Sequence, residues 1–119
     1  CGKTGCLEQV ASATGIARLA GTKNAKEVFD LAKAGDKDME AVIEKVCSYI
    51  GKGLACAAAI ADPECFVIGG GVSAAGDYFI DKIKKYYKKQ AFHPSADTAI
   101  VKATLLNDAG IYGAAKLAL

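Results

Sequence analysis

The sequence has little proline, little net charge and no long hydrophobic run. Only 2 of its 119 residues are proline and 52% are hydrophobic, a composition typical of a folded domain and not of a disordered tail. Fifteen Lys and Arg residues against thirteen Asp and Glu residues leave a net charge of +2, too small an excess to indicate a nucleic-acid-binding surface. The longest uncharged segment, 65–76, is shorter than the roughly 20 residues that a bilayer requires. We therefore expect neither a nucleic-acid partner nor a membrane.

The chain does not begin with methionine, which predicts a fragment of a longer protein, and its N-terminus shows no signal-peptide pattern. Its five cysteines are an odd number, which argues against a disulfide framework and favours a reducing compartment. Cys47, Cys56 and Cys65 lie in apolar runs, where we expect free thiols to behave as small hydrophobes. Cys1 and Cys6 differ, because they lie in a glycine-containing loop.

Apolar residues recur at spacings of three and four, the pattern of helices that bury one face. The expected helices span residues 7–20, 24–34, 37–61, 75–90 and 108–118. Two apolar runs, 65–68 and 98–105, predict strands. The strand–helix–strand order predicts a β-α-β unit with parallel strands. Because two parallel strands do not form an independent sheet, we expect further strands either N-terminal to Cys1 or from another chain.

Two features of the second half of the chain invite a functional interpretation. The helix expected at 75–90 carries the lysines Lys82, Lys84, Lys85, Lys88 and Lys89. We interpret them as a solvated helix face rather than as a partner surface. The single histidine, His93, lies beside Phe92 and Pro94, and we interpret it as part of a surface loop rather than as a catalytic residue.

Three short segments could carry chemistry, and the first is the loop from Cys1 to Glu8. Two thiols five positions apart on a loop with glycines can fold back onto one metal ion. A structural zinc needs four ligands, however, so two incidental loop cysteines remain an alternative. Glu8 stands at a helix start, where the helix dipole favours a carboxylate in any case.

The second segment places Gly69, Gly70 and Gly71 directly after an expected strand. Glycines there allow the main chain to approach a flat or anionic ligand. The segment has neither the spacing of the dinucleotide fingerprint nor the Lys-Ser/Thr of a phosphate loop, so a ligand-binding turn and a plain tight turn both remain open. The third segment, 107–115, contains Gly110 and Gly113, for which close helix packing is a sufficient explanation.

Together the three segments resemble the C-terminal part of the ROK family (repressors, open reading frames and sugar kinases). Cys1-Gly2-Lys3-Thr4-Gly5-Cys6-Leu7-Glu8 resembles the family signature C-x-C-G-x-x-G-C-x-E from its second cysteine onward. The Ile-Gly-Gly-Gly-Val-Ser run at 68–73 resembles the adenosine-side motif, and 107–115 resembles the closing helix. The run at 11–16 is similar to the glucokinase branch. The resemblance implies an α/β fold, as part of the C-terminal lobe of an actin-like, hexokinase-type (ribonuclease H-like) structure.

The resemblance also implies roles for single residues. Cys1 and Cys6 would be two of three zinc-binding cysteines, Glu8 would accept hydrogen bonds from sugar hydroxyls, and the glycines at 69–71 would face adenosine. It implies no catalytic residue in this chain. The first signature cysteine, the zinc-binding histidine, the phosphate loop and the catalytic aspartate are expected upstream. Leu106 stands where the family usually has glycine, so the turn before the last helix is expected to differ.

We therefore expect a single lobe over residues 1–119, with a partial zinc and sugar loop at 1–8, a helical segment at 9–62 and a nucleotide-side β-α-β-α unit at 64–119. The implied function is part of a cytoplasmic, homodimeric, glucokinase-like enzyme that phosphorylates glucose at the 6-hydroxyl with ATP, Mg²⁺ and a structural Zn²⁺. The fragment by itself is expected to be inactive. The alternatives are the sugar-sensing lobe of a ROK-type transcriptional repressor and a structural module with an empty glycine turn.

Overall fold

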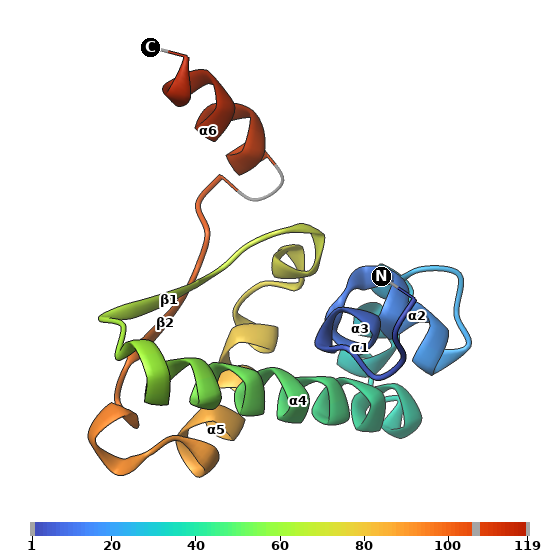
Figure 1. The fold of residues 1–119 in the computed structure, drawn as a ribbon. Helices are drawn as coiled ribbons and strands as arrows, with labels where there is room; N and C mark the ends of the chain where they lie inside the picture. The colour runs from blue at the N-terminus through green and yellow to red at the C-terminus, as the bar shows by residue number, and fades with distance from the viewer. Residues whose placement is uncertain (1, 106–107, 119) are drawn as a thin grey trace.

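The computed structural model describes residues 2–105 and 108–118, and one long helix organises it (Figure 1). The N-terminal half contains α1 (Leu7–Ala11), α2 (Ala13–Ala20), α3 (Ala25–Lys33) and the long α4 (Lys37–Ala61). The C-terminal half contains β1 (Cys65–Ile68), η1 (Gly71–Ala75), α5 (Asp77–Gln90), η2 (His93–Ser95), β2 (Ala99–Lys102) and α6 (Ala109–Leu117). Helices α1 to α3 gather at one end of α4, and α5 with the strands lies toward the other end (Figure 1).

The two strands pair in parallel, which confirms the predicted β-α-β unit. Cys65 pairs with Ala99 and Ile68 with Lys102, so the register covers four residues on each strand. One further bond, from the N–H of Ala103 to the carbonyl of Ile68 at 2.9 Å, ends the pairing. The strand predicted at 98–105 is therefore too long, because β1 offers only four partners.

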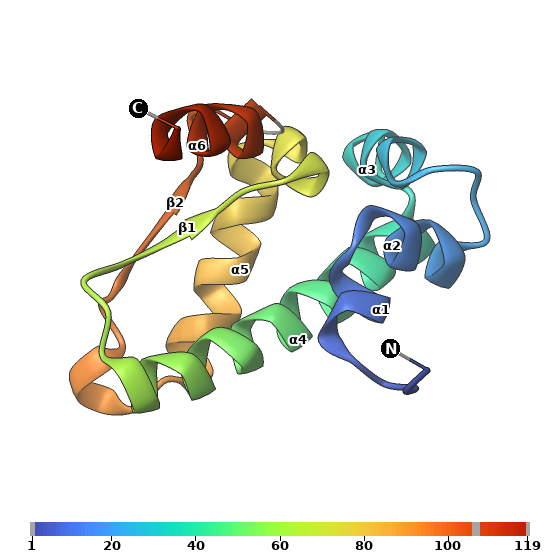
Figure 2. The same cartoon turned by 45° about the horizontal axis from the view of Figure 1, so that its top comes forward.

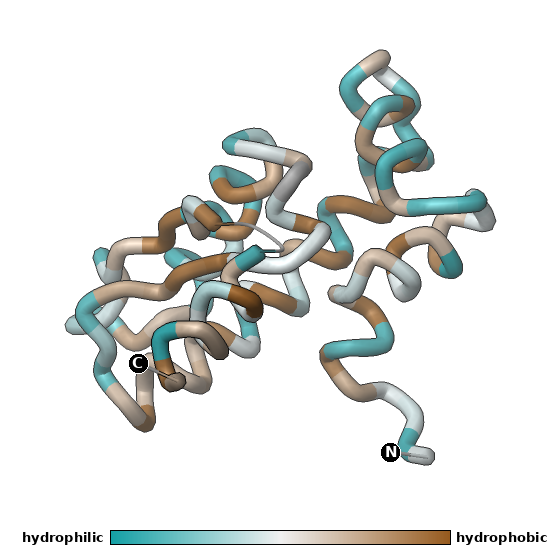
Figure 3. Tube along the Cα trace, turned by 90° about the horizontal axis from the view of Figure 1, so that it is seen from above, coloured by the Kyte–Doolittle hydropathy of each residue, from teal (hydrophilic) through white to brown (hydrophobic). Residues whose placement is uncertain are grey.

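One face of this sheet is open. Ile100 is buried, and the Phe66 ring meets the Tyr87 ring of α5 edge-on, with their centroids 5.9 Å apart. On the opposite face Val67 is 63% exposed and Val101 is 43% exposed. Figure 3 colours the chain by hydropathy, with hydrophobic stretches in brown and hydrophilic ones in teal. Half of an apolar strand thus faces solvent in this chain.

Only one of the three cysteines in apolar runs behaves as the predicted small hydrophobe. Cys47 does so: it is fully buried, and burial raises the pKa of its thiol to about 12. Cys56 on α4 and Cys65 on β1 are exposed. The prediction is wrong for these two because they lie on faces of α4 and β1 that no other described element covers.

Helix α4 has the predicted bounds, and both of its ends follow from local chemistry. The Asp36 carboxylate caps its first turn by accepting hydrogen bonds from the N–H groups of Asp38 and Met39. Asp62 leaves the helix in the left-handed region (φ 40°) just before Pro63. Within residues 2–105 and 108–118, no helix combines the length and hydropathy of a bilayer-spanning segment.

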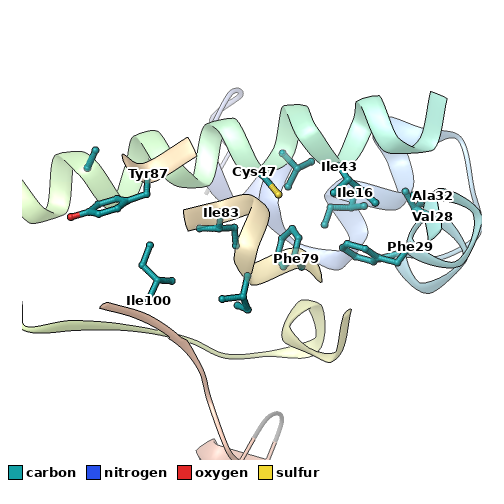
Figure 4. Packing of buried hydrophobic residues seen from close by; sticks show 14 of the residues in the cluster. Ile16, Val28, Phe29, Ala32, Ile43, Cys47, Phe79, Ile83, Tyr87 and Ile100 are labelled. Carbon is teal, nitrogen blue, oxygen red and sulfur yellow. The ribbon is translucent and has the colours of Figure 1, made fainter. Parts of the chain in front are cut away.

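Helices α4 and α5 cross in backbone contact. A Cβ on Gly51 would lie 2.8 Å from the Tyr87 nitrogen, so this crossing has no room for a side chain. The core runs along both helices and into α2, α3 and β2; Figure 4 labels Ile16, Val28, Phe29, Ala32, Ile43, Cys47, Phe79, Ile83, Tyr87 and Ile100. An edge-to-face contact between Phe29 and Phe79, with centroids 5.2 Å apart, joins α3 to α5.

The single helix predicted over 7–20 is wrong, because the chain breaks at Ser12 into α1 and α2. Ser12 is extended (ψ 160°), and its side chain accepts a hydrogen bond from the N–H of Gly15 at 3.1 Å. The break leaves Glu8 on a helix of five residues and turns α2 into a new direction.

Helix α6 stands apart from the other helices in Figure 1, and the turned view of Figure 2 brings it forward, over the end of α5. None of its residues is buried; Ile111 is 73% exposed and Leu117 is 91% exposed. The close packing expected of Gly110 and Gly113 is not found among the described residues. The predicted cap at Asn107 and the substitution at Leu106 lie outside the described residues.

The lysine face of α5 is only partly solvated. Lys82 was predicted to point outward, but its side chain is 15% exposed and pairs with Glu40 at 3.1 Å and with Glu44. Burial alone would raise the pKa of Glu44, but hydrogen bonds from Lys82 and Tyr86 outweigh that effect and lower it. Burial alone would lower the pKa of Lys82, but its hydrogen bonds to Glu44 and Glu40 outweigh that effect and raise it. This network joins α4 to α5.

We predict that Glu44→Gln lowers the free energy of unfolding by about 1–2 kcal/mol at pH 7, the usual contribution of charge-assisted hydrogen bonds. The native pKa of Glu44 lies below its unfolded value, so its stabilisation is complete above the unfolded pKa and is lost as the pH falls through the native pKa. Urea unfolding at several pH values is the measurement. The difference between the variant and the wild type should therefore shrink as the pH falls below the unfolded pKa of Glu44; a constant difference would contradict the role of the carboxylate.

Candidate functional site

A cavity of about 500 Å³ lies between α1 with the start of α2 on one side and the turn after β1 on the other. It is lined by Leu7, Glu8, Ala11, Ser12, Ala13, Ile50, Ile68, Gly69, Gly70, Gly71, Val72 and Phe79. The turn after β1 faces α1 and α2 in Figure 1. The fold thus places the predicted sugar-side carboxylate and the predicted nucleotide-side glycines on one cavity, although they are distant in the sequence.

The glycine turn leaves its main chain open. Gly70 has φ 78° and ψ −177°, a conformation that only glycine adopts readily. A Cβ built on Gly70 meets no atom within 4 Å, so the turn has open space in front of it. A ligand in the cavity could therefore approach the main chain directly.

Ser73 and Lys33 hold this turn in place. Ser73 is buried, and both its hydroxyl (2.6 Å) and its N–H (3.1 Å) donate to the Gly70 carbonyl. The Lys33 ammonium of α3 donates to the Ala75 carbonyl at 3.3 Å. Sequence reasoning gave neither residue a role. The hydroxyl just after the glycines was an available signal for Ser73, whereas nothing marks Lys33, because its partner is a main-chain oxygen 42 positions away.

A second, smaller cavity of about 190 Å³ adjoins the same turn. It is lined by Lys26, Phe29, Asp30, Lys33, Gly71, Val72 and Ala75. Gly71 and Val72 line both cavities, so the two spaces meet at the turn. The smaller cavity combines the apolar side chains of Phe29 and Val72 with the ammonium groups of Lys26 and Lys33.

The opposite wall of the larger cavity carries the carboxylate. Glu8 is exposed in the first turn of α1. The apolar side chains of Leu7, Ile50 and Phe79 line the cavity around it. An ionised carboxylate accepts several hydrogen bonds, so this wall suits a small ligand that offers hydroxyl donors and an apolar face.

The thiol loop is described only in part. Gly2 and Gly5 both have positive φ (75° and 77°), which confirms that the glycines turn this loop. Cys6 is half-buried and stands at the N-terminus of α1, and Cys1 lies outside the described residues. No cluster of three or more His, Cys, Asp or Glu residues suited to a metal occurs in the part of the chain that the structure describes. Cys6 fits one ligand position of a structural zinc, which takes four.

The sequence profile of the ROK family matches residues 1–119, the whole chain. The chain belongs to the ROK family. Two curated relatives illustrate the sequence similarity. A glucokinase of Halalkalibacterium halodurans is 43% identical over 95% of this chain and 40% of its own length. An N-acetylmannosamine kinase of Escherichia coli O7:K1 is 36% identical over 100% of this chain and 41% of its own length. This ROK chain therefore spans about 40% of the length of the curated relatives it matches.

Structural similarity supports the same relationship. The ROK family glucokinase of Streptomyces griseus, crystallised with glucose and AMPPNP, matches 98% of this chain and 45% of its own with a TM-score of 0.88 and 28% identity. The expected fold class, a helix-rich α/β part of an actin-like, hexokinase-type lobe, is confirmed by this match. The expected ROK resemblance is confirmed as well.

Proposed function

We propose that this chain is the C-terminal lobe of a ROK-family hexose kinase that transfers the γ-phosphoryl group of Mg-ATP to the 6-hydroxyl of glucose. The observation that carries the proposal is the cavity of about 500 Å³ that has Glu8 on one wall and the glycine turn on the other. Phosphoryl transfer depends on holding two substrates close together, and a cavity shared by a hydroxyl-binding carboxylate and an open main-chain turn suits that task. We further propose a cytoplasmic homodimer.

In this proposal the hexose lies on the Glu8 side. The carboxylate accepts hydrogen bonds from vicinal sugar hydroxyls, and the side chain of Ile50 contacts the apolar face of the ring. An acceptor of this kind orients the sugar without taking part in the transfer of the phosphoryl group. Glu8 is therefore assigned to substrate binding and not to catalysis.

The nucleotide lies against the turn on the opposite side. Gly69, Gly70 and Gly71 let the adenosine approach the main chain, and Ser73 keeps the turn in this conformation. The smaller cavity, with Phe29 and Val72 on its wall, adjoins the turn and suits the base. Bound in this way, the ATP phosphates with their Mg²⁺ would extend from the turn toward the larger cavity.

Two groups that the reaction needs have no counterpart in this sequence: a phosphate loop and an aspartate that takes the proton from the sugar hydroxyl. We propose that the other lobe of the intact enzyme supplies them. The open face of the sheet, with Val67 and Val101, and the unburied α6 suit contact with that lobe. The units 1–8, 9–62 and 64–119 then serve as the sugar loop, the helical support and the nucleotide side.

We also propose that Cys6 and Cys1 ligate a structural zinc. Cys6 stands on a loop that two positive-φ glycines turn, at the start of the helix that carries Glu8. When bound, zinc would fix this loop and would add stability to the sugar side of the cavity.

The proposal is tested on the intact polypeptide by measuring ADP formation from ATP with glucose and with N-acetylmannosamine. Glucose-dependent ADP formation is the expected result. DNA binding that a hexose releases, without ADP formation, would instead assign the chain to a ROK repressor. Calorimetry with ATP separates the kinase from a structural module, because the absence of heat at millimolar nucleotide would leave the turn without a ligand.

The isolated 119-residue chain is expected to form no ADP above the background of a sample without protein. It carries the proposed binding groups but lacks the proton acceptor and the phosphate loop. The measurement is a coupled assay with glucose and ATP on the purified chain. Glucose-dependent ADP production by that chain would show that the proposed division of labour between the lobes is wrong.

A further inference from the structure

Helix α1 carries Glu8 but is too short to hold itself in place. It has five residues, and isolated helices of fewer than about 12 residues are marginal in water. None of its residues is buried. The position of the Glu8 carboxylate must therefore depend on contacts that α1 makes with other elements.

The end of α1 has an unusual partner. In a continuous helix the Gln9 carbonyl would accept a hydrogen bond from the N–H four residues later. The extended conformation of Ser12 breaks the helix before that bond. The Arg18 guanidinium of α2 donates to the Gln9 carbonyl instead, at 2.6 Å. A cation there also complements the negative end of the α1 dipole.

The contact between α1 and α2 is close enough to require glycine. A Cβ on Gly15 would lie 2.3 Å from the Gln9 oxygen, so only glycine lets this carbonyl come so near to α2. The side chain of Gln9 reaches the other way and donates to the Lys3 carbonyl at 2.9 Å. Gln9 thus connects α2 to the thiol loop.

The choice of residue type at position 18 supports a specific role. Arg18 is the single arginine among the fifteen Lys and Arg residues of the chain. The Arg18 side chain is exposed, but its planar guanidinium is pre-organised and loses less freedom than a lysine ammonium for each hydrogen bond it forms.

We propose that Arg18 is a positioning residue that fixes α1, and through it the Glu8 carboxylate, by binding the Gln9 carbonyl that Gly15 admits. Its contribution to hexose binding rests on the proposed function of Glu8. Its contribution to the placement of α1 does not, because the contact exists in the chain without any ligand.

The experiment compares Arg18→Ala, Arg18→Lys and the control Lys23→Ala in the intact polypeptide. Lys23 is an exposed cation just after α2. The first readout, without ligand, is hydrogen exchange at the Ser12 amide, which bonds to the Glu8 carbonyl at 3.1 Å. The second is the KM for glucose and the KM for ATP.

Arg18→Ala is expected to speed hydrogen exchange at the Ser12 amide about ten-fold and to raise the KM for glucose about ten-fold. The KM for ATP should stay within about two-fold of the wild-type value. These effects are what the loss of one charge-assisted hydrogen bond predicts. Arg18→Lys should recover part of both effects, since an ammonium can still donate once, and Lys23→Ala should change neither.

The proposal would be overturned if Arg18→Ala matched Lys23→Ala both in exchange at Ser12 and in the KM for glucose. Equal rises in the KM for glucose and the KM for ATP would overturn it as well. A fourth variant, Glu8→Gln, separates the two claims. If Arg18→Ala speeds exchange but Glu8→Gln leaves the KM for glucose unchanged, the positioning of α1 is supported and the proposed role of Glu8 is wrong.

Discussion

Replacing Glu8 by glutamine in the intact polypeptide is expected to raise the KM for glucose about 10- to 100-fold while the KM for ATP changes little. The amide keeps the size of the side chain but removes the charge and replaces one acceptor oxygen by a donor. A hydrogen bond to a charged group contributes about 1.5–3 kcal/mol, and each 1.4 kcal/mol is a factor of ten in binding. Steady-state kinetics with each substrate varied in turn is the measurement.

Glu64→Gln is the matched control for this prediction. Glu64 is exposed beside Pro63 and does not line the cavity, so the same chemical change there should leave both KM values unaltered. If Glu8→Gln and the control behave alike, Glu8 does not bind the sugar. If Glu8→Gln raises both KM values equally, its effect lies in folding rather than in sugar recognition.

Replacing Gly70 by alanine is expected to raise the KM for ATP about ten-fold and to leave the KM for glucose within a factor of about two. Two effects combine. The backbone at φ 78° and ψ −177° is strained for any residue with a Cβ, at a cost of about 1–3 kcal/mol. The new methyl group also projects into the open space in front of the turn, where the nucleotide is proposed to lie.

Gly76→Ala separates these two effects. Gly76 has nearly the same backbone geometry (φ 78°, ψ −159°) but does not line either of the two cavities. Both variants should therefore lose similar amounts of thermal stability, and only Gly70→Ala should raise the KM for ATP. An unchanged KM for ATP in Gly70→Ala would mean that the glycine turn is a plain tight turn.

Most of the elements could be predicted from the sequence because local signals coincide with them. The bounds of α4 follow from the Asp36 cap and Pro63, and β1 follows from an apolar run that ends in glycine. The break at Ser12 was not predictable from periodicity, since the apolar stripe continues across it. That break depends on the approach of Gly15 to the Gln9 carbonyl, which is a tertiary contact.

The candidate site was predicted from resemblance rather than from spacing. Nothing in the spacing of Glu8 and Gly70 says that they line one cavity; the packing of α1 and α5 against α4 brings their walls together. The exposure of Cys65 could not be predicted either. Hydrophobicity shows that a residue suits burial, but not whether another segment is there to cover it.

The wall of the larger cavity is also the core of the lobe. Phe79 is 1% exposed, meets Phe29 edge-on and still lines the space beside Glu8. Reshaping this wall to admit a bulkier sugar would therefore remove packing atoms from the same side chain that joins α3 to α5. Under the proposed function, heat tolerance and substrate range are thus coupled in this lobe, and engineering one without the other requires changes on the α1 side.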